Sequence, residues 1–274
     1  MPRMGKNLEQ YLRRDVMPTP WCPGCGHGNI LRGLLESFDR LNLDLNKVVV
    51  IGGIGCSGRT PFFTNTNAMH TTHGRALAFA TGVKMTNPEL TVITAMGDGD
   101  SVGIGGNHFI HACRRNIDLN AIIFNNSIYG MTGGQSAPTT PRGKKSTTSR
   151  NGNIEPPFDI VDLSLAAGAT FVARTTTFDF QEIPNLISRA IKHPGFAVVE
   201  VLTQCPTYFG RINKLGDARD MLDYEKDLTV PGELQSREEI LGGMPIGVFR
   251  EEIKPEYVEQ YYHSFSEMEE NDAS

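Results

Sequence analysis

Two buried strands that end in polar residues constrain the fold of this chain more than any other feature. The first is expected at residues 91–95 and runs into the sequence Gly-Asp-Gly-Asp at 97–100. The second is expected at residues 121–124 and runs into an Asn-Asn pair at 125–126. The segment between them is long enough for a crossover helix, and right-handed crossovers make such strands parallel. Both polar ends then lie at one edge of an open α/β sheet, where ligands bind.

The residue types at this edge are those of a magnesium–diphosphate site. The Asp98 carboxylate, the Asn126 side-chain carbonyl and the Ile128 main-chain carbonyl are oxygen ligands, which Mg²⁺ prefers together with phosphates and water. The flanking glycines let the backbone approach a diphosphate, and the following helix N-terminus favours anions. A glycine-rich turn followed by an Asx turn, with no ligand, is the alternative. The candidate cofactor-binding residues here are Gly97, Asp98, Gly99, Asp100, Asn126 and Ile128.

Four of the five cysteines are expected in loops. Cys22 and Cys25 form a Cys-x-x-Cys motif, Cys56 lies in a glycine-rich loop after a buried strand, and Cys205 closes a later buried strand. Parallel strands would bring these loops to one edge, so the four thiolates indicate a 4Fe–4S cluster or a Cys₄ zinc site. A redox disulfide in the Cys-x-x-Cys motif and scattered buried cysteines are the alternatives. Cys113 lies within a predicted helix, and we interpret it as a packing residue.

A loop expected at residues 60–73 adds polar candidates at the same edge. His73 lies just before an Ala-rich helix expected at 76–85, where a neutral imidazole suits hydrogen bonding to a ligand. His70 is a weaker candidate. Arg59 follows Cys56 in its loop and is suited to binding the carboxylate of a substrate. A histidine beside a helix cap and a surface arginine are the alternatives.

These motifs resemble those of a known family. Thiamine pyrophosphate (TPP) enzymes carry Gly-Asp-Gly followed by an Asn pair, and here Asp98 and Asn126 are 28 positions apart. The motifs GDGD, GGNHFIHACRRN and FNNSIYGMTGGQ resemble those of the β subunits of the 2-oxoacid:ferredoxin oxidoreductases. The resemblance extends over about residues 20–210. The resemblance implies that Cys22, Cys25, Cys56 and Cys205 hold a 4Fe–4S cluster and that His73 lines the thiamine pocket. Gly55 and Ser57, in the loop of Cys56, are further cofactor-binding candidates.

The resemblance implies oxidative decarboxylation of a 2-oxoacid to an acyl-CoA and CO₂, with electrons passing through the cluster to ferredoxin, or the reverse carboxylation. His73 and Arg59 are the predicted catalytic residues. The sequences HTTHGRALAFATGVK and QCPTYFGR look closest to the 2-oxoglutarate enzymes, although pyruvate and branched-chain relatives share most of them. Three alternatives stay open: a non-oxidative TPP decarboxylase with structural zinc, an electron-transfer subunit that binds no TPP, and a thiol-disulfide oxidoreductase built on Cys22 and Cys25.

A partner chain is expected because TPP also needs a pyrimidine-binding domain. The 274 residues have room for one large α/β domain, so an α subunit would supply the other, with the active site at the interface of the heterodimer. The chain has 26 basic and 31 acidic residues, so it lacks the excess of positive charge that is typical of nucleic-acid-binding proteins. Residues 251–274 carry eight acidic residues and one lysine, a net charge of −7, which is typical of a solvated or partner-facing end.

The expected architecture is a doubly wound, mostly parallel α/β sandwich. Residues 1–209 are predicted to form the domain that binds TPP and the cluster, and 210–274 an irregular, partner-facing extension with one apolar patch at 244–249. Residues 136–157 read as a long loop, either a lid or polar surface. Neither a secretory signal nor a membrane span is expected, so the chain reads as cytoplasmic. Further helices are expected at 29–40, 159–167 and 180–192, and strands at 48–51, 170–173 and 196–202.

Overall fold

The centre of the molecule is one eight-stranded sheet in the computed structural model, which describes residues 8–231 and 243–272. The strands are β1 (Val48–Gly52), β2 (Asn67–His70), β3 (Thr91–Gly97), β4 (Asn120–Asn125), β7 (Phe171–Thr176), β8 (Ala197–Leu202), β9 (Thr229–Pro231) and β10 (Met244–Glu251). Their spatial order is β2-β1-β3-β4-β8-β7-β10-β9. All pairings from β2 to β7 are parallel, and β10 runs antiparallel to β7. A separate small hairpin pairs β5 (Ile128–Tyr129) with β6 (Gln135–Ser136).

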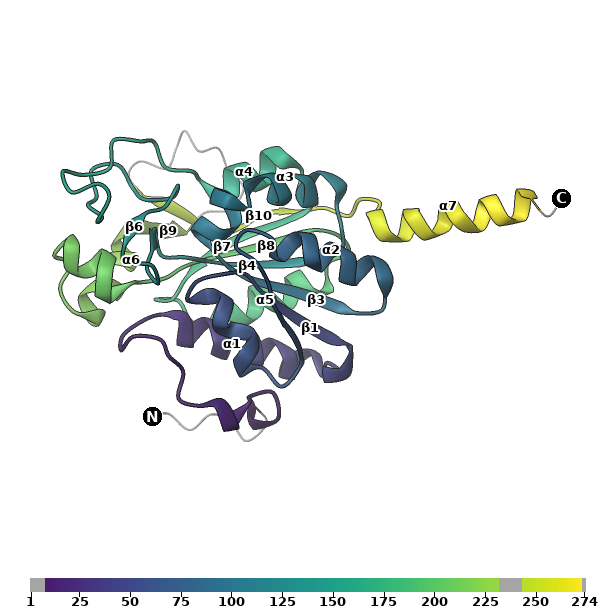
Figure 1. Ribbon diagram of the computed structural model, residues 1–274, viewed down its shortest axis with the longest axis horizontal. Coiled ribbons are helices and arrows are strands. Elements are labelled where there is room, and N and C mark those ends of the chain that lie inside the picture. The colour runs from purple at the N-terminus through teal and green to yellow at the C-terminus, as the bar shows by residue number, and fades with distance from the viewer. Residues whose placement is uncertain (1–7, 232–242, 273–274) are drawn as a thin grey trace.

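Helices cover both faces of this sheet (Figure 1). They are α1 (His27–Leu41), α2 (Ala76–Thr86), α3 (Gly106–Arg115), α4 (Ile160–Ala167) and α5 (Ile183–Lys192). Two further helices are α6 (Ala218–Leu228) and α7 (Tyr257–Asp272). One hydrophobic core joins α1 and α5 to the sheet, and a second core on the opposite face joins α2, α3 and α4 to it. The predicted doubly wound, mostly parallel α/β fold is therefore confirmed.

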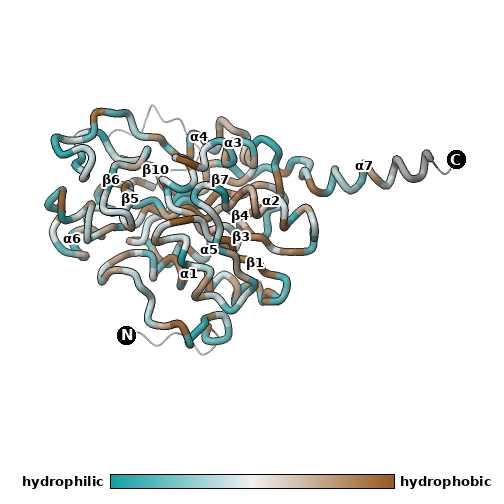
Figure 2. The backbone as a smooth tube through the Cα atoms, in the orientation of Figure 1, coloured by the Kyte–Doolittle hydropathy of each residue, from teal (hydrophilic) through white to brown (hydrophobic). Residues whose placement is uncertain are grey.

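The strand sequences explain why the sheet is buried on both faces. In β1, Val48 and Val50 belong to the core with α1 and α5, whereas Val49 and Ile51 belong to the core with α2 and α3. Successive side chains point to opposite faces, so a strand covered on both sides needs a continuous apolar run. Figure 2 shows the hydrophobic segments concentrated in the central strands and the hydrophilic ones in the outer loops.

Two predictions about irregular segments are wrong. Residues 60–73, expected as loop, contain the end of a 3₁₀ helix (Ser57–Phe63) and the edge strand β2. The side chains of β2 are mostly exposed, so it lacks the apolar pattern that marks a strand. The region after residue 210, expected as irregular, contains α6, β9, β10 and α7. Pro and Gly within β10 mask its strand character, yet it pairs with β7 in the main sheet.

The last helix lies apart from the body of the molecule. Figure 1 shows α7 projecting away from the sheet layers, with the C-terminus at its far end. Near its base, the Tyr262 hydroxyl donates a hydrogen bond to the Met85 carbonyl over 2.6 Å. Within residues 8–231 and 243–272, no helix has both the length and the apolar character needed to cross a membrane.

Candidate cofactor and metal site

One cavity lies at the carboxyl ends of β1, β3 and β4, where the sequence places the candidate ligands. Its lining includes all nine residues that we predicted to bind the cofactor. It also includes Cys56 and two side chains that the sequence did not single out, His27 and Tyr129. The nine predicted residues are Gly55, Ser57, His73, Gly97, Asp98, Gly99, Asp100, Asn126 and Ile128. Parallel strands bring these separate segments together because all their carboxyl ends face one edge.

Asp98 is a deeply buried acidic group of this cavity, with an exposed fraction of 2%. Burial raises the pKa of its carboxyl to about 7, although hydrogen bonds from Thr139 and from backbone N–H groups, including that of Asn126, oppose the shift. The Thr139 hydroxyl donates directly to the Asp98 carboxylate. A buried carboxylate without a full charge partner is a costly arrangement unless a cation neutralises it. The backbone N–H of Asn126 contacts the Asp98 carboxyl, so the two residues predicted to bind Mg²⁺ through their side chains are neighbours in the cavity.

The turn that follows β4 is held in an uncommon backbone conformation. Ser127 has φ of +59°, in the left-handed region that residues with a Cβ rarely adopt. The Asn125 side-chain oxygen accepts from the Ser127 N–H over 3.1 Å, and the Asn126 oxygen accepts from the Ile128 N–H over 3.3 Å. The Thr140 hydroxyl donates to the Ser127 carbonyl over 2.6 Å. The Asn126 oxygen thus already has one partner, and its second lone pair is the one left for a metal.

Asp100 links three loops around the cavity. Its carboxylate accepts from the Gly74 N–H over 2.8 Å and from the Ile54 N–H over 3.2 Å, and one of its oxygens lies 3.4 Å from Nε2 of His73. Burial raises the pKa of this carboxyl. A Cβ at Gly53 would overlap the Asp100 carboxylate, so glycine is needed there. The second oxygen of Asp100 is buried and has no partner among the described residues.

The structure separates the two candidate histidines and places Arg59 outside the cavity lining. His73 lines the cavity, and its ring meets that of Tyr129 edge to face at 6.1 Å between centroids. His70 instead lies in β2, with its Nδ1 3.1 Å from the Gly58 carbonyl. The Arg59 guanidinium stands over the Phe62 ring, 5.8 Å from its centroid.

The four loop cysteines lie close enough to influence one another. Burial raises the pKa of the Cys25 thiol to about 12, with smaller contributions from the thiols of Cys205, Cys56 and Cys22. The pKa of Cys56 is raised by burial and then by Cys205 and Cys22, while the Arg59 charge lowers it. Burial also raises the pKa of Cys205, and the Asp98 carboxylate adds to that shift. The four cysteines predicted to hold the cluster therefore lie near one another and near the predicted Mg²⁺ site. This agrees with the prediction that their loops meet at one edge of the sheet.

These cysteines do not form a compact site for a single metal ion. Across the described part of the chain, no group of three or more His, Cys, Asp or Glu side chains is arranged to hold one metal ion. Cys22 is exposed and Cys113 is buried, whereas Cys25, Cys56 and Cys205 are half-buried. The Trp21 indole donates to the Cys56 carbonyl over 2.8 Å and so ties the first cysteine loop to the second. Cys113 lies in α3 within the hydrophobic core, where we expected it to pack.

Sequence reasoning missed His27 and Thr139. His27 is fully buried between the rings of Trp21 and Phe124, burial lowers its pKa to about 4, and its Nδ1 has no partner among the described residues. Its position two residues after Cys25, in Gly-His-Gly, was the available signal. Thr139 belongs to the long loop expected at 136–157, which contacts Asp98 and Ser127 through adjacent threonines. Nothing in that Ser- and Thr-rich sequence distinguishes these two hydroxyls.

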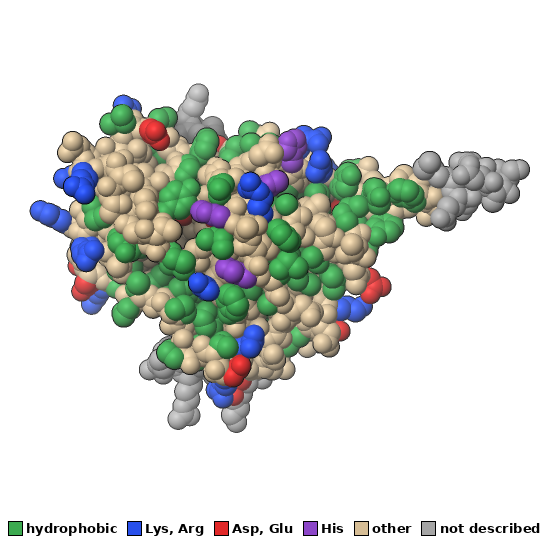
Figure 3. Space-filling view, in the orientation of Figure 1, with side chains coloured by type: hydrophobic (Ala, Val, Ile, Leu, Met, Phe, Trp, Pro, Cys, Tyr) green, Lys and Arg blue, Asp and Glu red, His purple; other side chains and the backbone are tan. Residues whose placement is uncertain are grey.

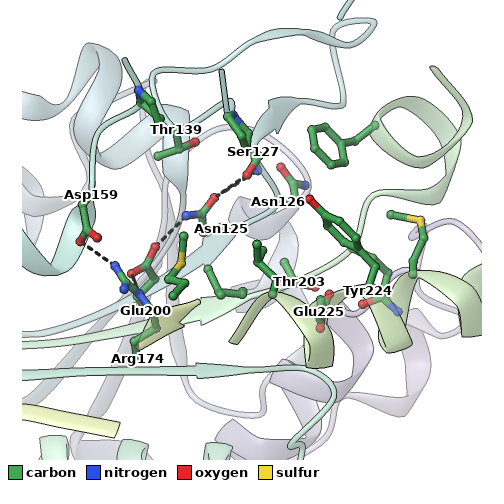
Figure 4. A pocket seen from close by; sticks show the side chains of 18 of the residues that line it. Asn125, Asn126, Ser127, Thr139, Asp159, Arg174, Glu200, Thr203, Tyr224 and Glu225 are labelled. Atoms are coloured by element: carbon green, nitrogen blue, oxygen red, sulfur yellow. Dashed lines mark hydrogen bonds and ion pairs between the residues drawn. The ribbon is translucent and has the colours of Figure 1, made fainter. Parts of the chain in front are cut away.

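A second cavity, of about 220 Å³, lies behind the turn at 125–127 (Figure 4). Its wall combines polar side chains of that turn and of the sheet with apolar side chains such as Leu202 of β8 and Met221 of α6. Glu225 of α6 lines it and accepts from the Thr177 hydroxyl over 2.8 Å and from the Phe178 N–H over 3.2 Å. Burial raises the pKa of Glu225 to about 8, and these hydrogen bonds only partly oppose the shift. The carboxyl is therefore largely protonated at neutral pH.

Glu225→Gln is expected to flatten the dependence of stability on pH. Because the folded-state pKa of about 8 lies above the ordinary glutamate pKa of 4.5, Glu225 stabilises the fold fully below pH 4.5 and loses that contribution as pH rises to 8. The loss is on the order of 1 kcal/mol per pH unit. Urea unfolding between pH 5 and 8 measures it. Asp227→Asn, which alters an exposed carboxylate on the same helix, is the control. Parallel pH profiles for Glu225→Gln and the unaltered chain would contradict the assignment.

Comparison with known proteins places this site in a family. Residues 53–201 match the family described as thiamine pyrophosphate enzyme, C-terminal TPP binding domain. The chain is 50% identical to the 2-oxoglutarate synthase subunit KorB of Archaeoglobus fulgidus, over 94% of each chain. It is 47% identical to a 2-oxoacid:ferredoxin oxidoreductase subunit beta of Sulfolobus sp, over 69% of this chain and 62% of that one.

A solved structure shows the same fold over nearly the whole chain. The 2-oxoglutarate:ferredoxin oxidoreductase from Magnetococcus marinus, with 2-oxoglutarate, coenzyme A and succinyl-CoA bound, superposes with a TM-score of 0.87 at 33% identity. The superposition covers 98% of this chain and 92% of that one. The resemblance read from the motifs is thus confirmed by sequence and by structure. The chain belongs to the β subunits of the 2-oxoacid:ferredoxin oxidoreductases, a family of TPP-binding oxidoreductases that includes the 2-oxoglutarate synthase β subunits.

Proposed function

We propose that the chain is the β subunit of an enzyme that oxidatively decarboxylates 2-oxoglutarate to an acyl-CoA and CO₂ and reduces ferredoxin, or runs the reverse carboxylation. The observation that carries this proposal is the meeting of all nine predicted cofactor-binding residues in one cavity beside four cysteines. The names of the relatives support the substrate class. Pyruvate and branched-chain 2-oxoacids are the alternative substrates.

The residues present fit a magnesium–diphosphate group. Asp98 is buried, its pKa is raised and it contacts the backbone of Asn126. Burial makes the ionised carboxylate unfavourable, and a divalent cation bound there would neutralise its charge. Asp98, the Asn126 side-chain oxygen and the Ile128 carbonyl would hold Mg²⁺. Oxygens of the TPP diphosphate would complete its coordination shell. Gly97 and Gly99 line the cavity, and a Cβ at Gly99 would overlap the Tyr129 ring, so glycine is needed there. The helical segment that begins at Gly99 would present N–H groups to an anion.

The four loop cysteines also fit a 4Fe–4S cluster. One zinc ion needs four sulfurs within about 2.3 Å of one atom, whereas a 4Fe–4S cluster binds each thiolate to a different iron and so spaces them more widely. The thiols of Cys22, Cys25, Cys56 and Cys205 influence one another without forming a compact single-ion site among the described residues. The effect of Asp98 on Cys205 supports a cluster placed next to the TPP site.

The cofactors, when bound, supply the carbanion chemistry of decarboxylation and the acceptance of single electrons, and this chain supplies their positions. His73 lies in the cavity and would hydrogen-bond to the cofactor or substrate, with Asp100 beside its Nε2. Arg59, in the loop of Cys56, would bind the substrate's carboxylate after its guanidinium turns away from the Phe62 ring. The buried rings of His27 and Phe124 close the inner wall and exclude water from it.

An α subunit that carries the pyrimidine-binding domain is the proposed partner, with 2-oxoacid, CoA and ferredoxin as the other binding partners in the cytoplasm. Figure 3 shows hydrophobic side chains and histidines gathered over α2 and α3. Phe79 of α2 is 45% exposed, and Ile104, just before α3, is 53% exposed. Met131, which lines the cavity, is also exposed. Exposed apolar surface beside a ligand site is typical of a subunit interface.

Metal analysis of the complex, purified without oxygen, tests this function. We expect about four iron atoms and four acid-labile sulfides per chain, since each cysteine of a cubane cluster binds one iron. We also expect reduction of ferredoxin to depend on 2-oxoglutarate and CoA. Zinc in place of iron, with TPP still bound, would indicate a non-oxidative TPP decarboxylase. Faster reduction with pyruvate than with 2-oxoglutarate would change the substrate and leave the reaction class intact.

A further inference from the structure

A chain of buried polar contacts runs from the middle of the sheet to the turn that follows β4 (Figure 4). Arg174 of β7 donates through Nε to Glu200 of β8 over 2.6 Å and through Nη2 to Asp159 over 2.6 Å. Both Arg174 and Glu200 have side chains that are 1% exposed. The other Glu200 oxygen accepts from the Asn125 side-chain NH₂ over 2.7 Å. Glu200 thus connects a buried arginine to the residue that precedes the predicted metal ligands.

The charge of Glu200 determines which way the Asn125 amide points. An ionised carboxylate can only accept hydrogen bonds, so the NH₂ end of the amide must face Glu200. The carbonyl end then faces the other way, where it accepts from the Ser127 N–H over 3.1 Å. A flipped amide would lose the bond to Glu200 and place an N–H group against the N–H of Ser127.

The Ser127 conformation depends on such support. A residue with a Cβ at φ of +59° costs roughly 1–2 kcal/mol, so the bonds around it must hold it there. Asn125 holds its N–H, and Thr140 holds its carbonyl. This turn directs the chain from Asn126 to Ile128, the two ligands that the metal site takes from this segment. A change in the Asn125 amide would therefore act on the turn that carries Asn126 and Ile128.

We propose that Glu200 is a positioning residue for magnesium, which acts through Asn125 to hold the turn 125–128 in its metal-binding conformation. The inference rests on the proposed TPP function. Partners of metal ligands that lie outside the coordination sphere typically contribute 10- to 100-fold to metal affinity. Glu200 lies 75 positions from Asn125 in the sequence, and only the pairing of β4 with β8 brings them together.

A purely structural role for Glu200 is the competing explanation, because a buried arginine needs a counterion. Asp159 separates the two roles. It is also a carboxylate on Arg174, but it belongs to the N-terminus of α4, which it caps by accepting from the Asp162 N–H. Asp159→Asn should weaken the same arginine cluster without altering the Asn125 amide. Glu200→Gln should do both.

The test measures the Mg²⁺ concentration that half-saturates TPP binding, by calorimetry on the complex with its partner subunit. We expect Glu200→Gln and Asn125→Ala each to raise this concentration at least tenfold. Asp159→Asn should stay within about twofold of the unaltered complex, although its melting temperature falls. In the Asn125→Ala background, Glu200→Gln should have no further effect, since its route to the metal is already broken. Asn125→Ala keeps the Arg174–Glu200 pair, so it serves even if Glu200→Gln fails to fold.

Three results would overturn the inference. An unchanged Mg²⁺ requirement in Asn125→Ala would show that the amide does not support the metal site. Equal shifts for Glu200→Gln and Asp159→Asn would reduce Glu200 to a structural counterion. Additive shifts in the double variant would show that Glu200 acts by another route. Absence of Mg²⁺-dependent TPP binding in the unaltered complex would instead refute the proposed function, and the inference with it.

Discussion

Asp98→Ala is expected to abolish Mg²⁺-dependent binding of TPP while the iron content stays unchanged. Asp98 is the only carboxylate among the three predicted magnesium ligands, and it is buried at the end of β3. Without it, the diphosphate would lose the charge bridge that Mg²⁺ provides. We expect TPP affinity to fall by at least 100-fold, beyond the range of calorimetry. Iron analysis of the same preparation should still give about four iron atoms per chain.

The apo protein provides a further readout for this variant. Because burial raises the pKa of Asp98 to about 7, its ionised form is unfavourable in the empty site. Asp98→Ala should therefore leave the melting temperature of the cofactor-free complex unchanged or raise it, while it removes the stabilisation that TPP adds. Asp98→Asn keeps the shape and the acceptor for Thr139 and should still lose most of the affinity. Unchanged TPP affinity in Asp98→Ala would show that the magnesium assignment is wrong.

Cys205→Ser is expected to lose the iron–sulfur cluster and all reduction of ferredoxin. Cys205 lies three residues after β8, where the charges of the Cys22 thiol and of the Asp98 carboxylate add to the rise of its pKa that burial causes. A serine hydroxyl is a far weaker ligand for iron than a thiolate, so the cluster would lose one of its four attachments. Iron and acid-labile sulfide, measured after purification without oxygen, should fall from about four per chain to near zero. TPP should still bind, since its ligands are untouched.

Cys113→Ala is the matched control for this loss. Cys113 is buried in α3 and packs in the core formed with α2 and α4. Its removal should lower stability by about 1 kcal/mol through lost packing and leave the iron content unchanged. Full iron occupancy in Cys205→Ser would remove Cys205 from the ligand set. Loss of iron in Cys113→Ala as well would point to unfolding as the common cause.

The buried strands and the loops at their ends were readable from the sequence. The apolar run at Val48–Gly52 and the run in β8 mark strands covered on both faces. Their order along the chain, with helices between them, requires parallel pairing. Parallel pairing in turn places the Gly-Asp-Gly segment, the Asn pair and the cysteine loops at one edge. The nine predicted cofactor residues do line one cavity. Their meeting could be predicted because it depends only on local residue pattern and on the handedness of the crossovers.

Other elements had no local signal. β2 is an exposed edge strand without alternation, and β10 contains Pro245 and Gly247 and is recruited by the free edge of β7. Both segments become strands because a neighbouring strand offers free backbone hydrogen-bonding groups, β1 for β2 and β7 for β10. A local sequence pattern does not reveal these pairings. The orientation of a side chain is also hidden from the sequence. The sequence places Arg59 in the loop of Cys56, but it does not show that the guanidinium lies over the Phe62 ring.

The sequence by itself determined the buried parallel strands, the family and the segments that meet at the site. The tertiary structure alone decided which side chains support those segments. Glu200 supports Asn125 from β8, Thr139 reaches Asp98 from a long loop, and Gly53 makes room for the Asp100 carboxylate. Such contacts join residues that are dozens of positions apart. They follow from strand order and side-chain packing in three dimensions, which no local pattern of residue types encodes.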